Sequence, residues 1–263
     1  MDTALDDIAF LANSDNRVAV FERLVDGSRA RDELTDQVDA SRVTIARILR
    51  ELEAREWITR SGQEYTVTPL GEWVYEVFTR LVDEMEAAQR LRDPYQWIPD
   101  DLMPFDIRRL RDAELILLDG TDPTALVRRI VEFHRSGERV RGLARSAAPT
   151  FIENQWELTV HGDTRVELVL TPEAVDVVRN HQPTAQKFCE MLNTTNARYS
   201  VYEEIPISVG IVNGTVGINL TDEQGILKGG IVTDDEAVHA WAVDLFKTCQ
   251  EQARPVNPDA ITV

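Results

Sequence analysis

The amino-acid sequence predicts an α+β protein built from a small helical N-terminal domain, a long linking helix and a C-terminal α/β domain with a mixed sheet. Three observations predict this class. An amphipathic helix is followed by a short hairpin pattern, a long apolar stripe comes next, and the second half of the chain alternates strand-like and helix-like segments. A chain of 263 residues has room for one or two domains. The expected boundaries are 1–68, 69–105 and 106–254, with a tail at 255–263.

Two short helices open the chain. Apolar residues recur at helical spacing within residues 1–13. A second helix is expected to start at Ser14 or Asp15 and to end at Gly27, because glycine readily adopts the backbone conformation that follows a helix. The side chains expected to face the core from this helix are Val18, Phe21, Leu24 and Val25.

A helix-turn-helix is expected next. Residues Arg31 to Val38 predict a short helix, and Asp39-Ala40 forms the turn after it. The following helix covers residues 41–56, with Ser41 as its capping residue. One apolar stripe at i, i+3, i+4 and i+7 would hold this helix on the core, and it consists of Ile45, Ile48, Leu49 and Leu52.

The opposite face of the helix over residues 41–56 carries spaced arginines between small residues. Such a face can lie in the major groove of DNA, where guanidinium groups reach guanine edges or phosphates. The same pattern also fits an ordinary surface helix whose arginines are only solvated. The segment after the helix favours the first interpretation.

A hairpin follows this helix. Residues 57–60 and 64–67 are β-branched and aromatic runs around Ser61-Gly62-Gln63, a three-residue loop typical of hairpins. Thr68-Pro69 then opens another helix. This order is typical of a winged helix-turn-helix, with Arg60 at the tip of the wing. The expected DNA-binding residues are Ser41, Arg42, Val43, Thr44, Ala46, Arg47, Arg50 and Arg60.

A long helix is expected from Leu70 to Arg92, because apolar residues recur there at three- and four-residue spacing. Its stripe could pack on the N-terminal domain, on the second domain, or on the same helix of a second copy. DNA sites read by winged helices are often two-fold symmetric, which favours a homodimer. Residues 93–105 contain three prolines and are expected to connect the two domains.

The second half of the chain predicts an α/β domain. Strands are expected at 115–118, 139–143, 165–170 and 198–202. Helical segments lie between them, which predicts a sheet that starts with parallel strands. Asn213-Gly214 is typical of a hairpin turn, so the sheet is expected to finish antiparallel. Residues 233–236 are expected to form a capping box that opens a final helix.

Candidate effector-binding residues follow from the predicted sheet, because open α/β sheets bind ligands beyond the carboxyl ends of their strands. These residues are Asp119, Gly120, Arg145, Ser146 and Thr171. Arg145 could pair with an anionic metabolite. A lone arginine at a strand end is, however, more often solvated or ion-paired.

The charge of the chain is strongly acidic, with a formal net charge of −18. The arginine-bearing face would therefore be a local basic island, since residues 41–60 hold five arginines against three glutamates. Only three of the 28 basic residues are lysine, a composition typical of a halophile's cytoplasmic protein. Molar salt shortens the screening length to about 3 Å and would weaken the repulsion of DNA. The acidic start and the short apolar runs predict a soluble cytoplasmic protein.

No cofactor, metal site or catalytic motif is expected. The four histidines have no partners at metal-ligand spacing, and they are His134, His161, His181 and His239. Cys189 and Cys249 lie in apolar helical stretches, so buried thiols are favoured over redox sensors or a disulfide. The sequence contains no nucleophile elbow, P-loop or dinucleotide-binding glycine motif.

Two sets of residues resemble a known family. The first set resembles archaeal winged-helix transcriptional regulators and consists of Ser41, Thr44, Ile45, Arg47, Leu49, Leu52, Glu53, Trp57-Ile58, Tyr65 and Thr68-Pro69-Leu70-Gly71-Glu72. The second set consists of residues 89–92, 97–99, 105–110 and 233–242. It is similar to the haloarchaeal branch that joins this head to the C-terminal domain of methanogenesis regulatory proteins, relatives of TrmB-like sugar-responsive regulators. Ala30 and Arg55-Glu56 depart from the usual capping residue and from the usual Ala-Gly.

The resemblance implies a transcriptional regulator with a C-terminal effector or dimerisation domain, and three functions are compared. The first is a homodimeric, sequence-specific DNA-binding regulator whose α/β domain senses an effector or a protein partner. The second is a protein-interaction module whose winged helix docks a partner instead of DNA. The third is an enzyme, because such C-terminal domains look distantly like phospholipase D folds. None of the four histidines is followed two residues later by the lysine that this chemistry uses, so we expect no enzyme.

Overall fold

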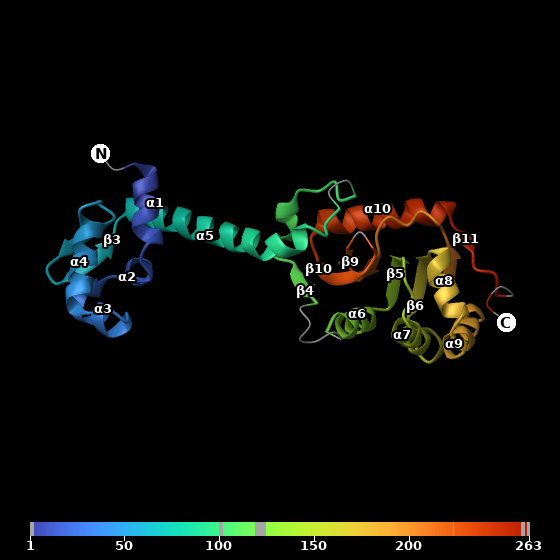
Figure 1. The fold of residues 1–263 in the computed structure, drawn as a ribbon. Helices are drawn as coiled ribbons and strands as arrows, with labels where there is room; N and C mark the ends of the chain where they lie inside the picture. Colours follow the sequence, from blue (N-terminus) through green and yellow to red (C-terminus); the bar gives the residue numbers. More distant parts are fainter. Residues whose placement is uncertain (1–2, 100–101, 119–124, 223, 259–260, 262–263) are drawn as a thin grey trace. The chain divides into compact units, whose positions relative to one another are not determined.

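The computed structural model describes residues 3–99, 102–118, 125–222, 224–258 and 261 (Figure 1). The chain forms two compact units, Met1–Glu86 and Ala87–Val263. The division between them falls within one long helix, α5 (Pro69–Tyr95). The predicted α+β class, with helices first and a mixed sheet in the second unit, is confirmed.

The described part of the first unit combines short helices with a small antiparallel sheet. The helices before α5 are α1 (Ala4–Ala12), α2 (Asp15–Val25), α3 (Arg31–Gln37) and α4 (Arg42–Glu53). The strands are β1 (Arg29–Ala30), β2 (Ile58–Ser61) and β3 (Glu64–Val67), in the order β1-β3-β2. The sequence patterns predicted each of these elements except β1.

The core of the first unit is built from the predicted apolar stripes. Phe21, Leu24 and Leu34 are fully buried together with the stripe of α4. The rings of Phe21 and Trp57 stack with their centroids 5.7 Å apart. A Cβ on Gly71 would lie 2.0 Å from the carbonyl oxygen of Trp57, so the start of α5 approaches the chain that leaves α4 as closely as only glycine allows.

Two details between α4 and β3 differ from the prediction. Ser61 pairs with Glu64, so the hairpin loop consists of Gly62 and Gln63 rather than three residues. Gly62 takes the left-handed conformation, φ 64°, that such tight turns require. Helix α4 ends at Glu53 instead of residue 56, and Glu56 adopts φ 59° where glycine is usual. The chain therefore turns sharply out of α4 before it enters β2.

Helix α5 is longer than predicted, because it continues through Pro94 to Tyr95. Phe78, near its start, is buried in the core of the first unit, whereas Leu91 belongs to the core of the second. Between them, Val77, Leu81 and Met85 are 40% to 54% exposed. Within a single chain, the predicted apolar stripe is therefore buried at its two ends and exposed in its middle.

The second unit contains an eight-stranded sheet in the order β11-β7-β6-β5-β8-β9-β10-β4 among the described residues. Its strands are β4 (Glu114–Leu117), β5 (Arg139–Ala144), β6 (Arg165–Leu170), β7 (Ala197–Val201), β8 (Val209–Val212), β9 (Thr215–Thr221), β10 (Leu227–Thr233) and β11 (Arg254–Pro255). Strands β5, β6 and β7 are parallel, as the helices between them require, and the remaining pairs are antiparallel.

The first strand of the second unit corrects one expectation. β4 does not begin a parallel run, because it lies at the sheet edge and pairs antiparallel with β10, with Leu115 opposite Ile231. The antiparallel hairpin is confirmed: Val212 pairs with Thr215 across Asn213-Gly214. Those two loop residues have φ values of 49° and 88°, as a two-residue turn of this kind requires.

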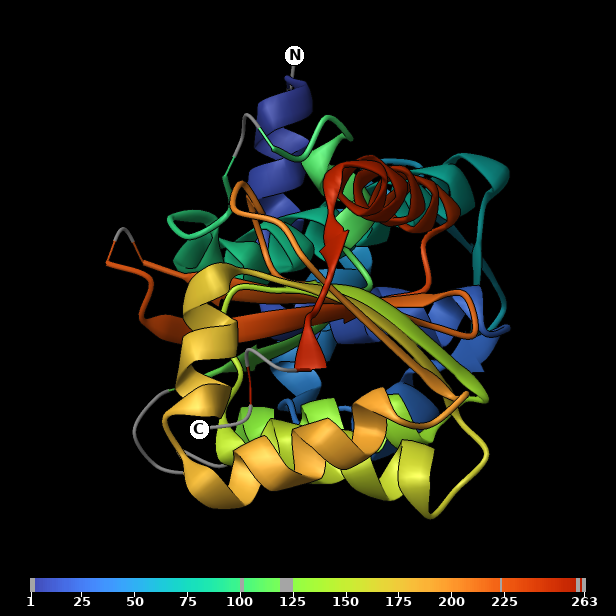
Figure 2. The ribbon, with the colours of Figure 1, turned by 90° about the vertical axis from the view of Figure 1, so that its right-hand side faces the viewer.

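Helices cover both faces of this sheet (Figures 1 and 2). They are α6 (Ala125–Arg135), α7 (Pro149–Val160), α8 (Pro172–Arg179), α9 (Gln182–Leu192) and α10 (Glu236–Gln252). Helix α10 lies on one face, and α6, α7 and α9 lie on the other. Two apolar clusters fill the space on the two sides of the sheet. No helix in the described residues is sufficiently long and apolar to cross a membrane.

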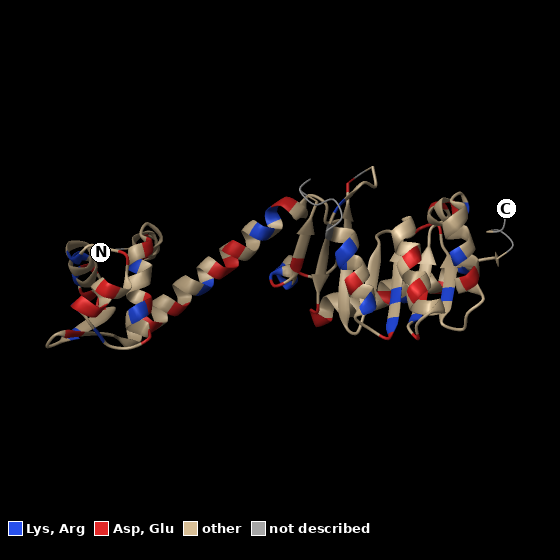
Figure 3. Ribbon diagram, turned by 90° about the horizontal axis from the view of Figure 1, so that it is seen from below, with Lys and Arg blue, Asp and Glu red and all other residues tan. Residues whose placement is uncertain are grey.

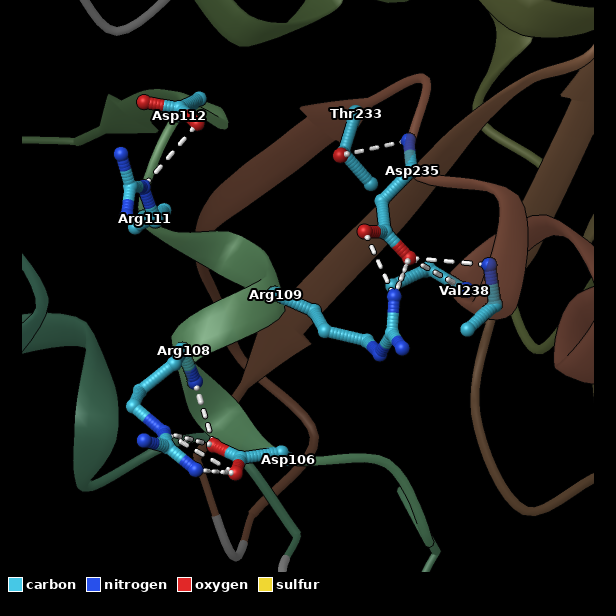
Figure 4. A network of polar contacts seen from close by, with 9 residues as sticks. Asp106, Arg108, Arg109, Arg111, Asp112, Thr233, Asp235 and Val238 are labelled. Atoms are coloured by element: carbon cyan, nitrogen blue, oxygen red, sulfur yellow. Dashed lines mark hydrogen bonds and ion pairs between the residues drawn. The ribbon is translucent and has the colours of Figure 1, made fainter.

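The connector after α5 is packed onto the second unit, since Ile98 and Met103 are buried in one of its apolar clusters. A short 3-10 helix, η1 (Ile107–Leu110), presents Arg109 to Asp235, with Arg109 Nη1 and Asp235 Oδ2 3.2 Å apart (Figure 4). Asp235 is also the N-cap of α10, accepting hydrogen bonds from the amides of Ala237 and Val238. The predicted capping box of residues 233–236 is therefore wrong in detail: Thr233 accepts from the Asp235 amide, and Asp235 caps the helix.

Candidate nucleic-acid interface

The start of helix α4 is fixed by local hydrogen bonds. Ser41 Oγ accepts from the amide of Thr44 at 3.1 Å and lies 2.9 Å from the Thr44 hydroxyl. Behind it, the apolar stripe of α4 is buried, with Ile45 and Leu52 completely inaccessible. Ser41 and Thr44, two of the expected DNA-binding residues, therefore lie at a helix start that is fixed by hydrogen bonds and by a buried stripe. Their own side chains are occupied in capping that start.

The outer face of α4 is open. Arg42, Val43, Arg47 and Arg50 are exposed, and Val43 is 78% exposed, which is unusual for a valine. Thr44 and Ala46 are half-buried beside them. Among the described residues, no ion pair involves Arg42 or Arg50, and Arg47 contacts a single carboxylate at 4.0 Å. This face can therefore present guanidinium groups and a methyl-bearing side chain to a partner.

The fifth arginine of this region does not belong to that face. The Arg55 guanidinium lies 3.9 Å from the centre of the Phe10 ring and 3.2 Å from Asp7, which ties α1 to the end of α4. The exposed positive charge of residues 41–60 therefore lies on the arginines of α4 and on Arg60, without Arg55. Figure 3 shows basic and acidic residues interspersed along α5 and over the second unit.

The β2–β3 hairpin and the neighbouring strand β1 carry two basic side chains, Arg60 and Arg29. Arg60 is exposed in β2, where its Nε donates to the carbonyl of Gly62 at 3.0 Å and its guanidinium lies 5.4 Å from the Tyr65 ring centre. Tyr65 pairs with Arg60 on one side and with Arg29 of β1 on the other. Directly opposite residues share a sheet face, so Arg29 and Arg60 flank Tyr65. Sequence reasoning missed Arg29, because nothing in its two-residue strand indicates pairing with β3.

Ala30 stands at the N-cap of α3, where a Ser or Thr is usual, and Glu33 of the same helix compensates for the missing side-chain cap. Ala30 cannot cap the helix with its side chain, but its own amide donates to Glu33 Oε2 at 2.7 Å. Half of a capping box therefore remains. The start of α3 is therefore held by a backbone amide, without the usual Ser or Thr side chain.

Among the described candidate effector residues, the Thr171 hydroxyl donates to the carbonyl of Arg145 at 3.3 Å, but Arg145 and Ser146 line different cavities. Asp119 and Gly120 lie outside the described residues. Thr171 is buried and caps α8, with its hydroxyl accepting from the Ala174 amide. Arg145 is exposed, its Nη1 donates to the carbonyl of Pro206 at 3.3 Å, and it lines a cavity of about 490 Å³ together with the connector. Ser146, the next residue, lines a different cavity on the α6 and α7 side of the sheet.

No arrangement for metal binding or histidine chemistry is found in the described part of the chain. His134 is buried beside Gln155, His161 packs edge-on against Trp156, and His181 contacts Thr184. No three His, Cys, Asp or Glu side chains among the described residues gather as ion ligands would. Cys249 is buried, and burial raises the pKa of its thiol.

Comparisons with known proteins give matches for both units. Residues 5–90 match the family described as HVO_A0261 N-terminal domain, and residues 123–252 match the family described as methanogenesis regulatory protein FilR1, middle domain. No curated protein sequence matches the chain.

Solved structures that are similar to this chain share little sequence with it. TrmBL2, described as an archaeal chromatin protein with a novel mode of DNA binding, is 14% identical, with 94% of this chain and 95% of that chain covered and a TM-score of 0.40. Nuc from Salmonella typhimurium, a phospholipase D family member, is 11% identical, with coverages of 56% and 98% and a TM-score of 0.42. Both TM-scores are below 0.5, so neither similarity assigns an activity.

Proposed function

We propose that this chain, whose two domains belong to the HVO_A0261 N-terminal and FilR1 middle-domain families, is a sequence-specific DNA-binding transcriptional regulator. The observation that carries the proposal is the outer face of α4. Three exposed arginines, Arg42, Arg47 and Arg50, lie around Val43, which is 78% exposed. The opposite face of α4 is buried in the core of the first unit. An apolar residue exposed between cations costs free energy in water, and it gains an apolar contact in a major groove.

The roles follow from the chemistry of each side chain. Arg42, Arg47 and Arg50 would reach guanine edges or phosphates, while Val43 and Ala46 would contact thymine methyl groups. Ser41, Thr44 and the wing arginines would contact the sugar-phosphate backbone, which fixes register without reading sequence. The exposed face of α4 supports this assignment, and the family that residues 123–252 match is described as a regulatory protein.

We propose that two copies bind together through α5. Five of the exposed apolar residues of this helix recur at spacings of three and four, and they are Leu70, Trp73, Val77, Leu81 and Met85. On a helix these positions form one stripe about four turns long. A second copy of the same stripe is a self-complementary partner, and the resulting two-fold pair matches a two-fold DNA site. The α/β unit would sense an effector or a partner protein and change the spacing of the two heads.

Selection of bound duplexes from a random pool, with the full chain at high potassium chloride, tests the proposal. A regulator that reads sequence is expected to enrich one motif, and to bind that duplex at least about 10³-fold more tightly than a scrambled one. If the recovered pool stays random and both duplexes bind equally, the winged helix is a module that docks a protein and does not read DNA.

A further inference from the structure

A cavity of about 130 Å³ lies in the second unit between α6, α7 and the sheet. Most of its wall is apolar, including Val131, Phe133, Leu143, Phe151 and Leu168. Polar atoms are supplied by a few side chains, namely His134, Ser146, Thr150, Ser208 and Asn219. None of the described residues that line it carries a formal charge at neutral pH. The wall therefore favours an uncharged occupant.

The cavity exists because three glycines meet across the sheet. Gly210 of β8 pairs with Gly142 of β5 on one side and with Gly217 of β9 on the other. A Cβ on Gly210 or Gly217 would lie 3.1 or 3.2 Å from the ring of Phe133. Larger residues would push α6 away from the strands. The glycine row thus lets Phe133 and His134 enter a recess in the sheet surface.

His134 is the buried polar group of this recess, with only 5% of the residue exposed. Gln155 Nε2 donates to its Nδ1 at 2.9 Å, and the rings of Phe133 and Phe151 flank it at 5.7 and 5.6 Å. Burial lowers the pKa of His134 to about 4, so the imidazole is neutral near pH 7. With Nδ1 accepting, the single ring proton resides on Nε2.

The Nε2–H group of His134 faces the recess. A Cβ on Gly210 would lie 3.4 Å from Nε2, so this atom is directed at the bare glycine strand. Within the described residues, no hydrogen bond to Nε2 is found. His134 as a residue is 5% exposed, its ring is held by Gln155, and its Nε2 is directed at the glycine strand that lines the cavity, so this donor is available to an occupant.

We propose that this cavity binds a small, uncharged and mainly apolar molecule that presents one hydrogen-bond acceptor to His134 Nε2. The volume suits a ring of about benzene size, since a dry apolar cavity of about 150 Å³ binds benzene. This molecule would be the effector proposed above, and its regulatory role rests on the proposed function of the chain as a transcriptional regulator. It differs from the Arg145 cavity, whose arginine favours an anion. Binding is measured without DNA, so its failure leaves the DNA-binding proposal standing.

Benzene and pyridine are the probes, because they share a shape and differ by one acceptor. Each is titrated at pH 7.5 into the full chain, with the methyl resonances of Val131 and Leu168, which line the cavity, followed by NMR. Both probes are expected to shift these methyls saturably, and pyridine is expected to move the ¹H and ¹⁵N resonances of His134 Nε2–H downfield. Absence of any saturable methyl shift overturns the site. Methyl shifts with an unmoved Nε2–H resonance overturn the role of His134.

Two variants separate the cavity from its polar group. His134→Leu is expected to bind benzene as the wild type does and pyridine roughly fivefold more weakly, the factor that one net hydrogen bond contributes. Retained benzene binding also establishes that the cavity of the variant is formed. Thr150→Phe, which places a ring at the exposed lining position, is expected to abolish the shifts caused by both probes. Unchanged pyridine affinity in His134→Leu, or unchanged shifts in Thr150→Phe, contradicts the proposal.

Discussion

Arg47 Nε lies 4.0 Å from Oε1 of Glu51, one turn further along α4, and the Arg47 side chain is still 60% exposed. Glu51 also lies 3.4 Å from Nε of Arg17, whose side chain is only 19% exposed. Glu51 therefore pairs both with the largely buried Arg17 and with Arg47, and it orients the Arg47 side chain without burying it. An exposed pair of this kind contributes little to stability, so Arg47 can exchange Glu51 for a DNA base or phosphate at small cost.

Replacing Arg47 by alanine is expected to weaken specific DNA binding by about 1–3 kcal/mol, because one guanine contact is lost. Fluorescence anisotropy with the selected duplex measures the effect. Arg23→Ala is the matched control, since the Arg23 side chain of α2 is 42% exposed and paired with Asp26, and the affinity of this variant should equal that of the wild type. If both variants bind alike, Arg47 does not belong to the interface.

Replacing Arg60 by alanine is expected to weaken binding to selected and scrambled duplexes by the same factor, because a wing arginine contacts phosphates and not bases. The slope of log K against log[KCl] should fall in magnitude by about 1. Titrations at several potassium chloride concentrations measure both quantities. A loss confined to the selected duplex would instead place Arg60 on a base edge.

The double variant Trp73→Glu, Leu81→Glu is expected to convert a dimer into a monomer. Both side chains are exposed in the single chain, at 65% and 40%, so the fold should survive while charge repels the second copy. Analytical ultracentrifugation measures the mass, with Glu76→Gln as the control on another face of α5. A wild type that sediments as a monomer, or a variant that stays dimeric, removes α5 as the interface.

Acid is expected to destabilise the second unit through His134. Its pKa in the folded state, about 4, is below the unfolded value of about 6.5, so the unfolded state binds more protons between these limits. This contribution to stability is therefore complete above pH 6.5 and is lost as the pH falls toward 4. The total is on the order of 3 kcal/mol.

Hydrogen exchange of the β5 and β6 amides between pH 5 and 7, analysed as opening free energies, measures that loss. The His134→Phe variant keeps an aromatic ring at the position and should lack this component of the pH dependence. The same slope in the variant and in the wild type would assign the effect to other groups.

Local periodicity was sufficient for the elements that carry the proposed interface. Ile45, Ile48, Leu49 and Leu52 mark one face of α4, so the outward face, with Val43 and the arginines, follows from geometry alone. Asn213-Gly214 likewise defined its hairpin, because few other residue pairs tolerate two positive φ values.

Features that depend on distant partners could not be predicted in this way. The direction of β4 is set by β10, more than a hundred residues later, and a strand pattern carries no information about its neighbour. Arg29 joins the wing only through pairing with Tyr65. The inward turn of Arg55 depends on Phe10 and Asp7, and the recess at His134 depends on glycines of three strands.

The most direct test of the central claim is a base-resolved cross-link from the most exposed apolar position of α4. The photoreactive amino acid p-benzoylphenylalanine is placed at position 43 in the full chain, and the protein is irradiated on the selected duplex. If α4 lies in the major groove, one dominant cross-link to a thymine within the selected motif is expected, and it should be lost on the scrambled duplex. Cross-links spread evenly over both duplexes, or formed only with protein, would contradict insertion of α4 into the major groove.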